Sequence, residues 1–223
     1  MSNKTLGPGE HTRVTRLPKK ANYDEKIIHT ILDEARMCHV AGIVGEKAMA
    51  LPTLHARKGS TLYLHGSQSN AIMKSVLVSG EAFVTVTHYD GLRLARSGFE
   101  SSIAYRSVVI FGPVTEVTDL EEKRKCLDMF VDAILPGRAD EVRPMNEREL
   151  HLTFVLAVEI NEASAKISAG PTEDFECDVD LPIWSGTIPS KLVFGEPVPN
   201  TDGAMATGEI ELPPSVQRLL ENQ

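Results

Sequence analysis

A short polar segment from Leu62 to Asn70 has the residue types needed to bind an anionic ligand. Its first half alternates apolar and polar residues, as a strand does, and its second half carries Ser67, Ser69 and Asn70 where a helical pattern begins. A helix N-terminus presents free backbone N–H groups and the positive end of the helix dipole, which suits a phosphate group. The same residue types are also ordinary helix caps. The segment therefore supports two interpretations, a phosphate site and a simple cap.

Arg106 is a second residue that could hold an anion. It lies between Tyr105 and Ser107 in a stretch rich in β-branched residues, which predicts a strand. A guanidinium there can bind a phosphate or a ring oxygen through charge-assisted hydrogen bonds, or it can pair with a carboxylate on a neighbouring strand. Trp184, the only tryptophan, lies in an irregular segment, where it could stack on a cofactor ring or anchor the tail in the core.

The composition excludes several classes of function. The 223 residues carry 23 Lys and Arg against 31 Asp and Glu, a formal net charge of -8, which argues against binding to nucleic acid. No apolar stretch is long enough to cross a membrane and no secretory signal begins the chain, so we expect a soluble, cytoplasmic protein. The three cysteines are widely spaced, and the seven histidines lack metal-binding spacing, so no disulfide framework or metal site is predicted.

Apolar periodicity predicts short strands and a few helices. Helices are expected over residues 24–36, over 69–78 with Ser67 or Ser69 as cap, and from the capping-box match at Thr118 to Ile134. A three-stranded meander is predicted from 38–44, 48–54 and 61–65, followed by strands at 82–88 and 91–95 around a turn at 89–91, and by strands at 103–117, 152–160 and 164–167. This pattern favours a closed antiparallel barrel with peripheral helices, residues 21–170, between an N-terminal arm, 1–20, and a C-terminal extension, 171–223.

Four groups of residues, taken in order, resemble one known family. They are Leu62 to Ser67; Leu94 to Ser97 with Tyr105 to Val108; Pro136 to Arg138 with Arg143 and Pro144; and Ser164 to Lys166 leading to Trp184 to Gly186. Their spacing is similar to that of the FMN-binding split-barrel family related to pyridoxamine 5'-phosphate oxidase, and in particular to its nitroimidazole-resistance-like branch. The resemblance covers about residues 16–188. It implies a mainly β fold, a six-stranded antiparallel split β-barrel with peripheral helices, which forms a homodimer with FMN at the interface.

The resemblance also implies which residues would contact FMN. The backbone of Ala50, Leu51, Pro52 and Thr53 would pass along the isoalloxazine ring; Leu64, His65 and Ser67 would line the ribityl chain; Ser69 and Asn70 would hold the phosphate; Tyr105, Arg106 and Ser107 would approach from an adjacent strand; and Trp184 would close the site from the partner chain. Relatives commonly carry arginine at the position of Asn70, so the phosphate contact here lacks a formal charge, for which Lys74 or Arg106 could compensate.

The expected function is that of an FMN-binding oxidoreductase, which passes electrons from a nicotinamide donor through the flavin to an unidentified small molecule. No catalytic residue is assigned. True pyridoxamine 5'-phosphate oxidase activity is not expected, because the stretch after Trp184 lacks the arginine and histidine of that enzyme's substrate motif. Two alternatives remain open: a flavin-binding or sequestering module without turnover, and a split barrel that uses a deazaflavin or heme.

Overall fold

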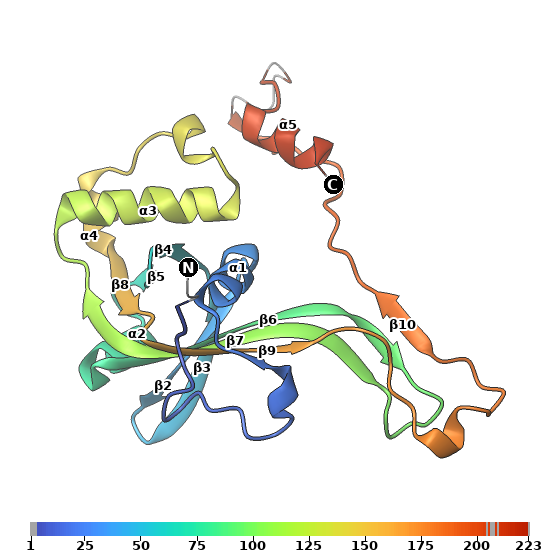
Figure 1. The fold of residues 1–223 in the computed structure, drawn as a ribbon. Helices are drawn as coiled ribbons and strands as arrows, with labels where there is room; N and C mark the ends of the chain where they lie inside the picture. The colour runs from blue at the N-terminus through green and yellow to red at the C-terminus, as the bar shows by residue number, and fades with distance from the viewer. Residues whose placement is uncertain (1–3, 204, 206–207, 209, 223) are drawn as a thin grey trace.

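The computed structural model describes residues 4–203, 205, 208 and 210–222 (Figure 1). One large antiparallel sheet, with helices packed on it, forms the body of the molecule. In the described residues the strands are β1 (Ala21–Asn22), β2 (Cys38–Val44), β3 (Lys47–Thr53), β4 (His55–Lys58), β5 (Thr61–Ser67), β6 (Glu81–Leu94), β7 (Ser102–Glu116), β8 (Thr153–Glu159), β9 (Glu162–Ser168) and β10 (Gly186–Pro189). The helices are α1 (Glu25–Glu34), α2 (Ala71–Ser79), α3 (Leu120–Ile134), α4 (Glu147–Leu152) and α5 (Pro214–Glu221), with short 3-10 turns η1 (Pro18–Lys20), η2 (Ala139–Glu141) and η3 (Glu176–Asp178).

Side-chain caps explain where three of the helices begin. Asp24 accepts hydrogen bonds from the backbone N–H groups of Lys26 and Ile27 at the start of α1, and Asp119 accepts one from Glu122 at the start of α3. Asn146 and Glu149 form a reciprocal capping box at α4. The helices predicted over 24–36 and up to Ile134 are confirmed, but the capping box predicted at Thr118 is wrong, because Asp119 is the cap. None of the helices in the described part of the chain is long and apolar enough to span a membrane.

The strand order is β3-β2-β6-β7-β8-β5-β4, with β9 and β10 pairing with β7 and β6. The expected antiparallel barrel is confirmed, but the described residues form ten strands rather than six. The predicted three-stranded meander is wrong, because β5 pairs with β4 and β8 and not with β3. The structure adds β4 between the second and third predicted strands.

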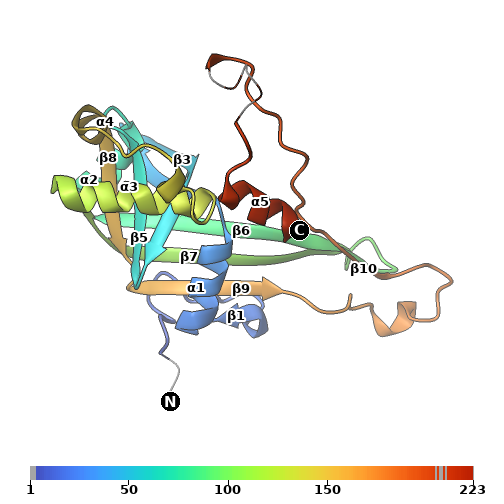
Figure 2. The same cartoon turned by 90° about the horizontal axis from the view of Figure 1, so that it is seen from above.

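The paired strands β6 and β7 form a long ribbon that projects beyond the barrel. The turn predicted at residues 89–91 is wrong: β6 continues through these residues, and only a bulge between Tyr89 and Gly91 interrupts the pairing. We call the projecting part the β-arm; it comprises residues 89–105 and 171–189, including β10. Figures 1 and 2 show β10 at the end of the ribbon farthest from α2. Contacts within the β-arm include the stacked rings of Phe99 and Phe175, 5.9 Å apart.

Two apolar clusters hold the barrel together. The larger one fills the interior between α1, α2 and the sheet, with Ile28, Leu64, Met73 and Ile110 among its fully buried members. The smaller one lies under α3, where Leu127, Phe130 and Val155 meet. Burial of these side chains is the main force that closes the barrel.

Both terminal segments contact the barrel. At the N-terminus, the backbone N–H and hydroxyl of Thr12 donate to the Glu162 carboxylate at 2.8 and 3.0 Å. At the C-terminus, α5 is tied to η2 because the backbone N–H of Ser215 donates to Glu141 at 2.8 Å and the Ser215 hydroxyl contacts the same carboxylate. The proposed division into arm, barrel and extension remains a prediction.

Candidate functional site

Strand β3 presents an open backbone edge. It pairs with β2 through the register Ala41 to Ala50 and His39 to Pro52, and no other strand of the described residues pairs with it. Pro52 is tolerated because an edge strand needs no N–H donor on its outer side. Ala50 and Pro52 are exposed, while Leu51 packs against the main core. The open edge leaves backbone groups unpaired with any other described strand, and the ligand contact expected for residues 50–53 stays a prediction.

Asn70 is the cap of α2. Its Oδ1 accepts a hydrogen bond from the backbone N–H of Met73 at 3.1 Å, so the expectation that Ser67 or Ser69 caps this helix is wrong. Ser67 and Ser69 are exposed, and their hydroxyl oxygens are 2.9 Å apart. Lys74 is exposed one turn further along and forms no ion pair with any described residue. The exposed hydroxyls, one ammonium group and the Nδ2 of Asn70 thus surround the start of α2.

Helix α2 lies beside β2, which in turn pairs with β3. The hydroxyl of Ser75 donates to the Ile43 carbonyl, and Gly42 leaves space for Val76, which lies 3.2 Å from where a Cβ at Gly42 would be. The open edge of β3 and the start of α2 therefore belong to one region of the barrel.

Leu64 and His65 point to opposite sides of β5. The Leu64 side chain is completely buried in the main core, so only its backbone could touch a ligand. The His65 ring packs on Phe130 of α3, with ring centroids 4.3 Å apart, and its buried Nδ1 has no hydrogen-bond partner among the described residues. Burial lowers the pKa of His65, which favours the neutral ring at neutral pH. Packing against α3 is the contact that the structure shows for His65.

Tyr105 and Ser107 lie on one face of the sheet and Arg106 on the other. Tyr105 is paired with Ser168 and Ser107 with Lys166, so these four side chains share a face. Arg106 lies on the face of the buried Val108. The three residues of the predicted group therefore cannot all point at one ligand.

Arg106 is held by two carboxylates. Its Nε and Nη2 donate to Asp90 at 2.9 and 3.0 Å, and its Nη1 contacts Glu34 of α1. The hydrogen bonds to Asp90, and then those to Glu34, raise the pKa of Arg106 above its already high value. Of the two interpretations of Arg106, pairing with a carboxylate on a neighbouring strand is the one that the structure shows.

Trp184 lies in the β-arm, and its side chain is 65% exposed. The segment that follows it pairs with the end of β6, from Leu94 to Gly91, far from α2 (Figures 1 and 2). Within one chain, Trp184 therefore does not approach the start of α2 or the edge of β3.

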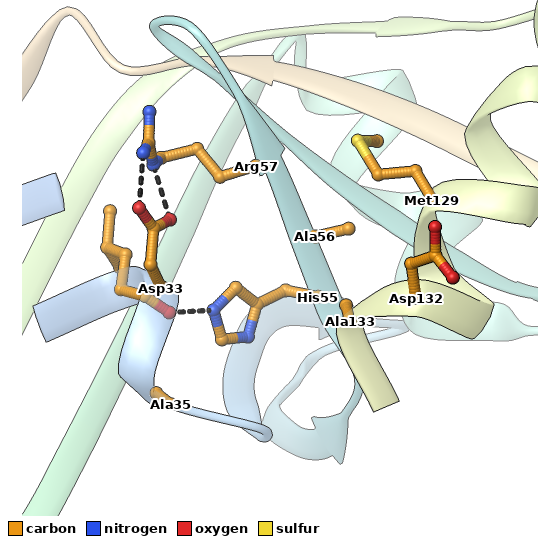
Figure 3. Close-up of a pocket in the computed structure, with 9 residues that line it drawn as sticks. Asp33, Ala35, His55, Ala56, Arg57, Met129, Asp132 and Ala133 are labelled. Atoms are coloured by element: carbon orange, nitrogen blue, oxygen red, sulfur yellow. Dashed lines mark hydrogen bonds and ion pairs between the residues drawn. The ribbon is translucent and has the colours of Figure 1, made fainter. Parts of the chain in front are cut away.

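A small pocket between α1, β4 and α3 contains a histidine that sequence reasoning did not single out (Figure 3). His55 is buried, and its Nε2 lies 2.9 Å from the Leu32 carbonyl, which requires Nε2 to carry the proton. Its Nδ1 is then an acceptor, buried without a partner among the described residues. Burial lowers the pKa of His55. No local pattern could have marked His55, because its role depends on a helix 23 residues earlier in the chain.

The carboxylates around this pocket have structural partners. Arg57 donates to Asp33 through Nε at 2.7 Å and also contacts it through Nη2, while Asp132 accepts a hydrogen bond from the backbone of Ala139 at 2.9 Å. In the described part of the chain, no three His, Cys, Asp or Glu side chains are grouped to hold a metal ion. The pocket measures about 260 Å³, and His55 serves there to tie the end of α1 to β4.

The fold is that of the flavin-binding split barrels. The family model described as pyridoxamine 5'-phosphate oxidase matches residues 24–167, and the chain belongs to this family. Among curated protein sequences, none matches the chain.

Two solved structures are similar over nearly the whole chain. The flavocytochrome Anf3 from Azotobacter vinelandii is 31% identical, with a TM-score of 0.88 over 95% of this chain and 97% of that one. The FAD and heme binding protein from Mycobacterium smegmatis is 33% identical, with a TM-score of 0.83 over 90% of this chain and 97% of that one. A Bacteroides thetaiotaomicron protein assigned to 5-nitroimidazole antibiotic resistance is 20% identical, with a TM-score of 0.56 over 66% of this chain and 86% of that one, and shares the fold.

Proposed function

We propose that the protein is a flavin-dependent oxidoreductase and that its cofactor is FMN. The flavin nucleotide would bind along the edge of β3 and at the start of α2. The observation that carries the proposal is the open backbone edge of β3, on a strand pair that α2 packs against, together with the exposed Ser67 and Ser69 hydroxyls that precede α2. The edge suits a planar ring with donors and acceptors along its rim, and the helix start suits a phosphate. Both features lie in the region matched by the family model.

The protein's own part in this function is binding and electrostatics. When bound, a flavin supplies the redox chemistry, taking a hydride from a reduced nicotinamide donor and passing electrons to a small-molecule acceptor. Outward-pointing N–H groups of β3 would stabilise negative charge on the reduced ring, although Pro52 offers only its carbonyl. Lys74 would supply the positive charge that Asn70 lacks. Leu64 would contribute only backbone contacts.

The functional unit is a homodimer in this proposal. Several large apolar side chains are exposed along the β-arm, and exposed apolar surface of this kind is typical of an interface. They include Tyr89, Leu92, Phe99, Ile103, Phe175, Ile183, Trp184 and Ile188. A second copy would bury this surface and could bring Trp184 to the partner's flavin.

The catalytic part of the proposal is tested by anaerobic titration of the flavin-loaded protein with reduced nicotinamide dinucleotide, followed by an added electron acceptor. We expect the oxidised flavin bands to bleach and then return. If neither NADH nor NADPH reduces the bound flavin, the protein is a flavin-binding or sequestering module without turnover. For the site, Lys74→Ala should weaken flavin binding several-fold, whereas Lys26→Ala, which removes an exposed lysine from α1, should leave it unchanged.

Flavin together with heme is a second candidate. The two relatives that cover 90% or more of this chain, and so extend beyond residues 24–167, are a flavocytochrome and a protein that binds FAD and heme. Within one chain, two of the histidines do not fit a porphyrin: the pocket at His55 is smaller than ordinary ligand pockets, and His65 is covered by Phe130. We therefore assign no axial ligand, and a Soret band in the absorption spectrum decides this candidate.

A further inference from the structure

Two basic side chains contact one buried hydroxyl at the end of β9, and a third lies on the same face of that strand. Nζ of Lys20 and Nη1 of Arg93 each donate to the Ser168 hydroxyl oxygen at 3.0 Å. Lys166 is on the same strand and the same sheet face as Ser168, two residues earlier. We call Lys20, Arg93 and Lys166 the basic cluster.

The basic cluster has no carboxylate of its own. Among the described residues, none of its three members forms an ion pair, and Arg93 donates otherwise only to the Pro171 carbonyl. The nearby Glu173 contacts Lys19 at 3.4 Å, with both side chains well exposed. Arg93 itself is 7% exposed, and its Nε is buried without a hydrogen-bond partner in the described part of the chain. A buried guanidinium normally has an anionic partner, so this arrangement is electrostatically incomplete.

The like charges act on one another. The pKa of Lys20 is lowered by burial and then by the positive charge of Arg93; Glu173 opposes this in part, and Lys166 and Lys19 lower the pKa further by smaller amounts. A bound anion would offset this repulsion. It would also accept hydrogen bonds from the N–H groups of Arg93 that remain free.

The surroundings favour a small anion. The chain has a net charge of -8, so an extended polyanion would be repelled, whereas a compact group carrying two or three negative charges matches three cations. None of the three cluster residues lines the nearby cavity of about 610 Å³, but two residues that line it contact Arg93: the Pro171 carbonyl accepts a hydrogen bond from Arg93, and Thr187 pairs with it in the sheet. The cavity has room for the rest of a nucleotide-sized molecule.

We propose that the basic cluster of Lys20, Arg93 and Lys166 binds a phosphoryl or pyrophosphoryl group of a small nucleotide. The site is formed by one chain and lies apart from the start of α2; if it holds the flavin's own phosphate, it replaces the phosphate contact proposed there. The phosphoryl group has two sources, the flavin nucleotide itself or a nucleotide electron donor.

The test is isothermal titration of the purified protein with inorganic pyrophosphate at constant ionic strength. We expect saturable binding that weakens tenfold or more in Lys20→Gln and in Lys166→Gln. Lys19→Gln is the matched control, because Lys19 is the neighbouring residue but is exposed and paired with Glu173, and it should bind as the unaltered protein does. Unchanged unfolding midpoints establish that the variants are folded. No binding by the unaltered sequence, either flavin-loaded or stripped of flavin, or equal binding by all three variants, would overturn the proposal.

The same titration identifies the source of the phosphoryl group. If only protein stripped of flavin binds pyrophosphate, the cluster holds the phosphate of the flavin nucleotide. If the flavin-loaded protein binds pyrophosphate and a reduced nicotinamide dinucleotide competes with it, the cluster holds the electron donor. Both results support an anion site.

Discussion

Arg106 and Asp90 are joined across β6 and β7 by two hydrogen bonds, of 2.9 and 3.0 Å, between one guanidinium group and both oxygens of one carboxylate. Asp90 is the residue that the β-bulge adds between Tyr89 and Gly91. The bulge thus places a carboxylate where Arg106 needs one, and Glu34 connects the same guanidinium to α1. The pair fixes the point where the barrel continues into the β-arm.

Replacing Arg106 with alanine should lower stability. The variant leaves Asp90 and Glu34 without their partner, and because these groups are partly exposed the loss should be about 1 kcal/mol. Urea unfolding measures it. Arg143→Ala, which removes an exposed arginine paired with Glu149, is the control and should show no measurable change. If Arg106→Ala weakened flavin binding while the unfolding midpoint stayed unchanged, Arg106 would act on the ligand and not on the fold.

Two substitutions at Asn70 separate its capping role from its expected role at the phosphate. Asn70→Ala removes the hydrogen bond to the Met73 N–H and should cost about 1 kcal/mol of stability. Asn70→Asp keeps a capping oxygen, so stability should be retained, but the added negative charge should weaken flavin binding. Thermal unfolding and a flavin titration measure the two effects. If Asn70→Asp and the unaltered protein bind flavin with equal affinity, the phosphate of the flavin nucleotide does not lie at Asn70.

Stability should fall on acidification because three histidines are buried or partly buried. Burial lowers the pKa of His55, His65 and His29 below the ordinary value, so below pH 6.5 the unfolded chain binds more protons than the folded one. The free energy of unfolding is then lost progressively as the pH falls from about 6.5 through the folded pKa values. Urea unfolding between pH 7.5 and 5 checks this.

His55→Gln isolates one of these contributions. A glutamine can still donate to the Leu32 carbonyl but does not titrate, so the variant should lose less stability on acidification than the unaltered protein. The exposed His151 provides the control, and His151→Gln should leave the pH dependence unchanged. An identical slope for His55→Gln would show that His55 is not a source of the acid sensitivity.

Trp184 reports directly on the proposed dimer because it is the only tryptophan. In a single chain it is 65% exposed, so its fluorescence should be red-shifted and readily quenched by acrylamide. In the dimer we expect a blue-shifted, protected emission that reverts on dilution, with sedimentation velocity measuring mass in parallel. If the protein sediments with the mass of two chains while its tryptophan emission remains that of an exposed residue, Trp184 does not lie in the dimer interface.

The sequence predicted the elements better than their partners. Helices α1 and α3 follow from Asp24, Asp119 and the apolar stripes after them, because these signals are local. The pairing of β5 with β8 is not local: it joins residues about 90 positions apart, and no short pattern reports it. The Tyr89–Gly91 segment was predicted as a turn because Asp and Gly favour turns, but the flanking strand pairing converts it into a bulge.

The candidate site was predictable in part. The polar start of α2 and the strand at residues 50–53 were found from sequence, although their contact with flavin remains a prediction. The basic cluster was not found, because Lys20, Arg93 and Lys166 are far apart in sequence and meet only through Ser168 and the pairing of β9 with β1 and β7.

The absorption spectrum of the purified protein, with mass identification of the small molecule that heat releases, tests the central claim most directly. We predict a yellow protein that releases a flavin nucleotide, with FMN or FAD distinguished by mass and heme revealed by a Soret band. A colourless protein that takes up neither added FMN nor added FAD would contradict the account.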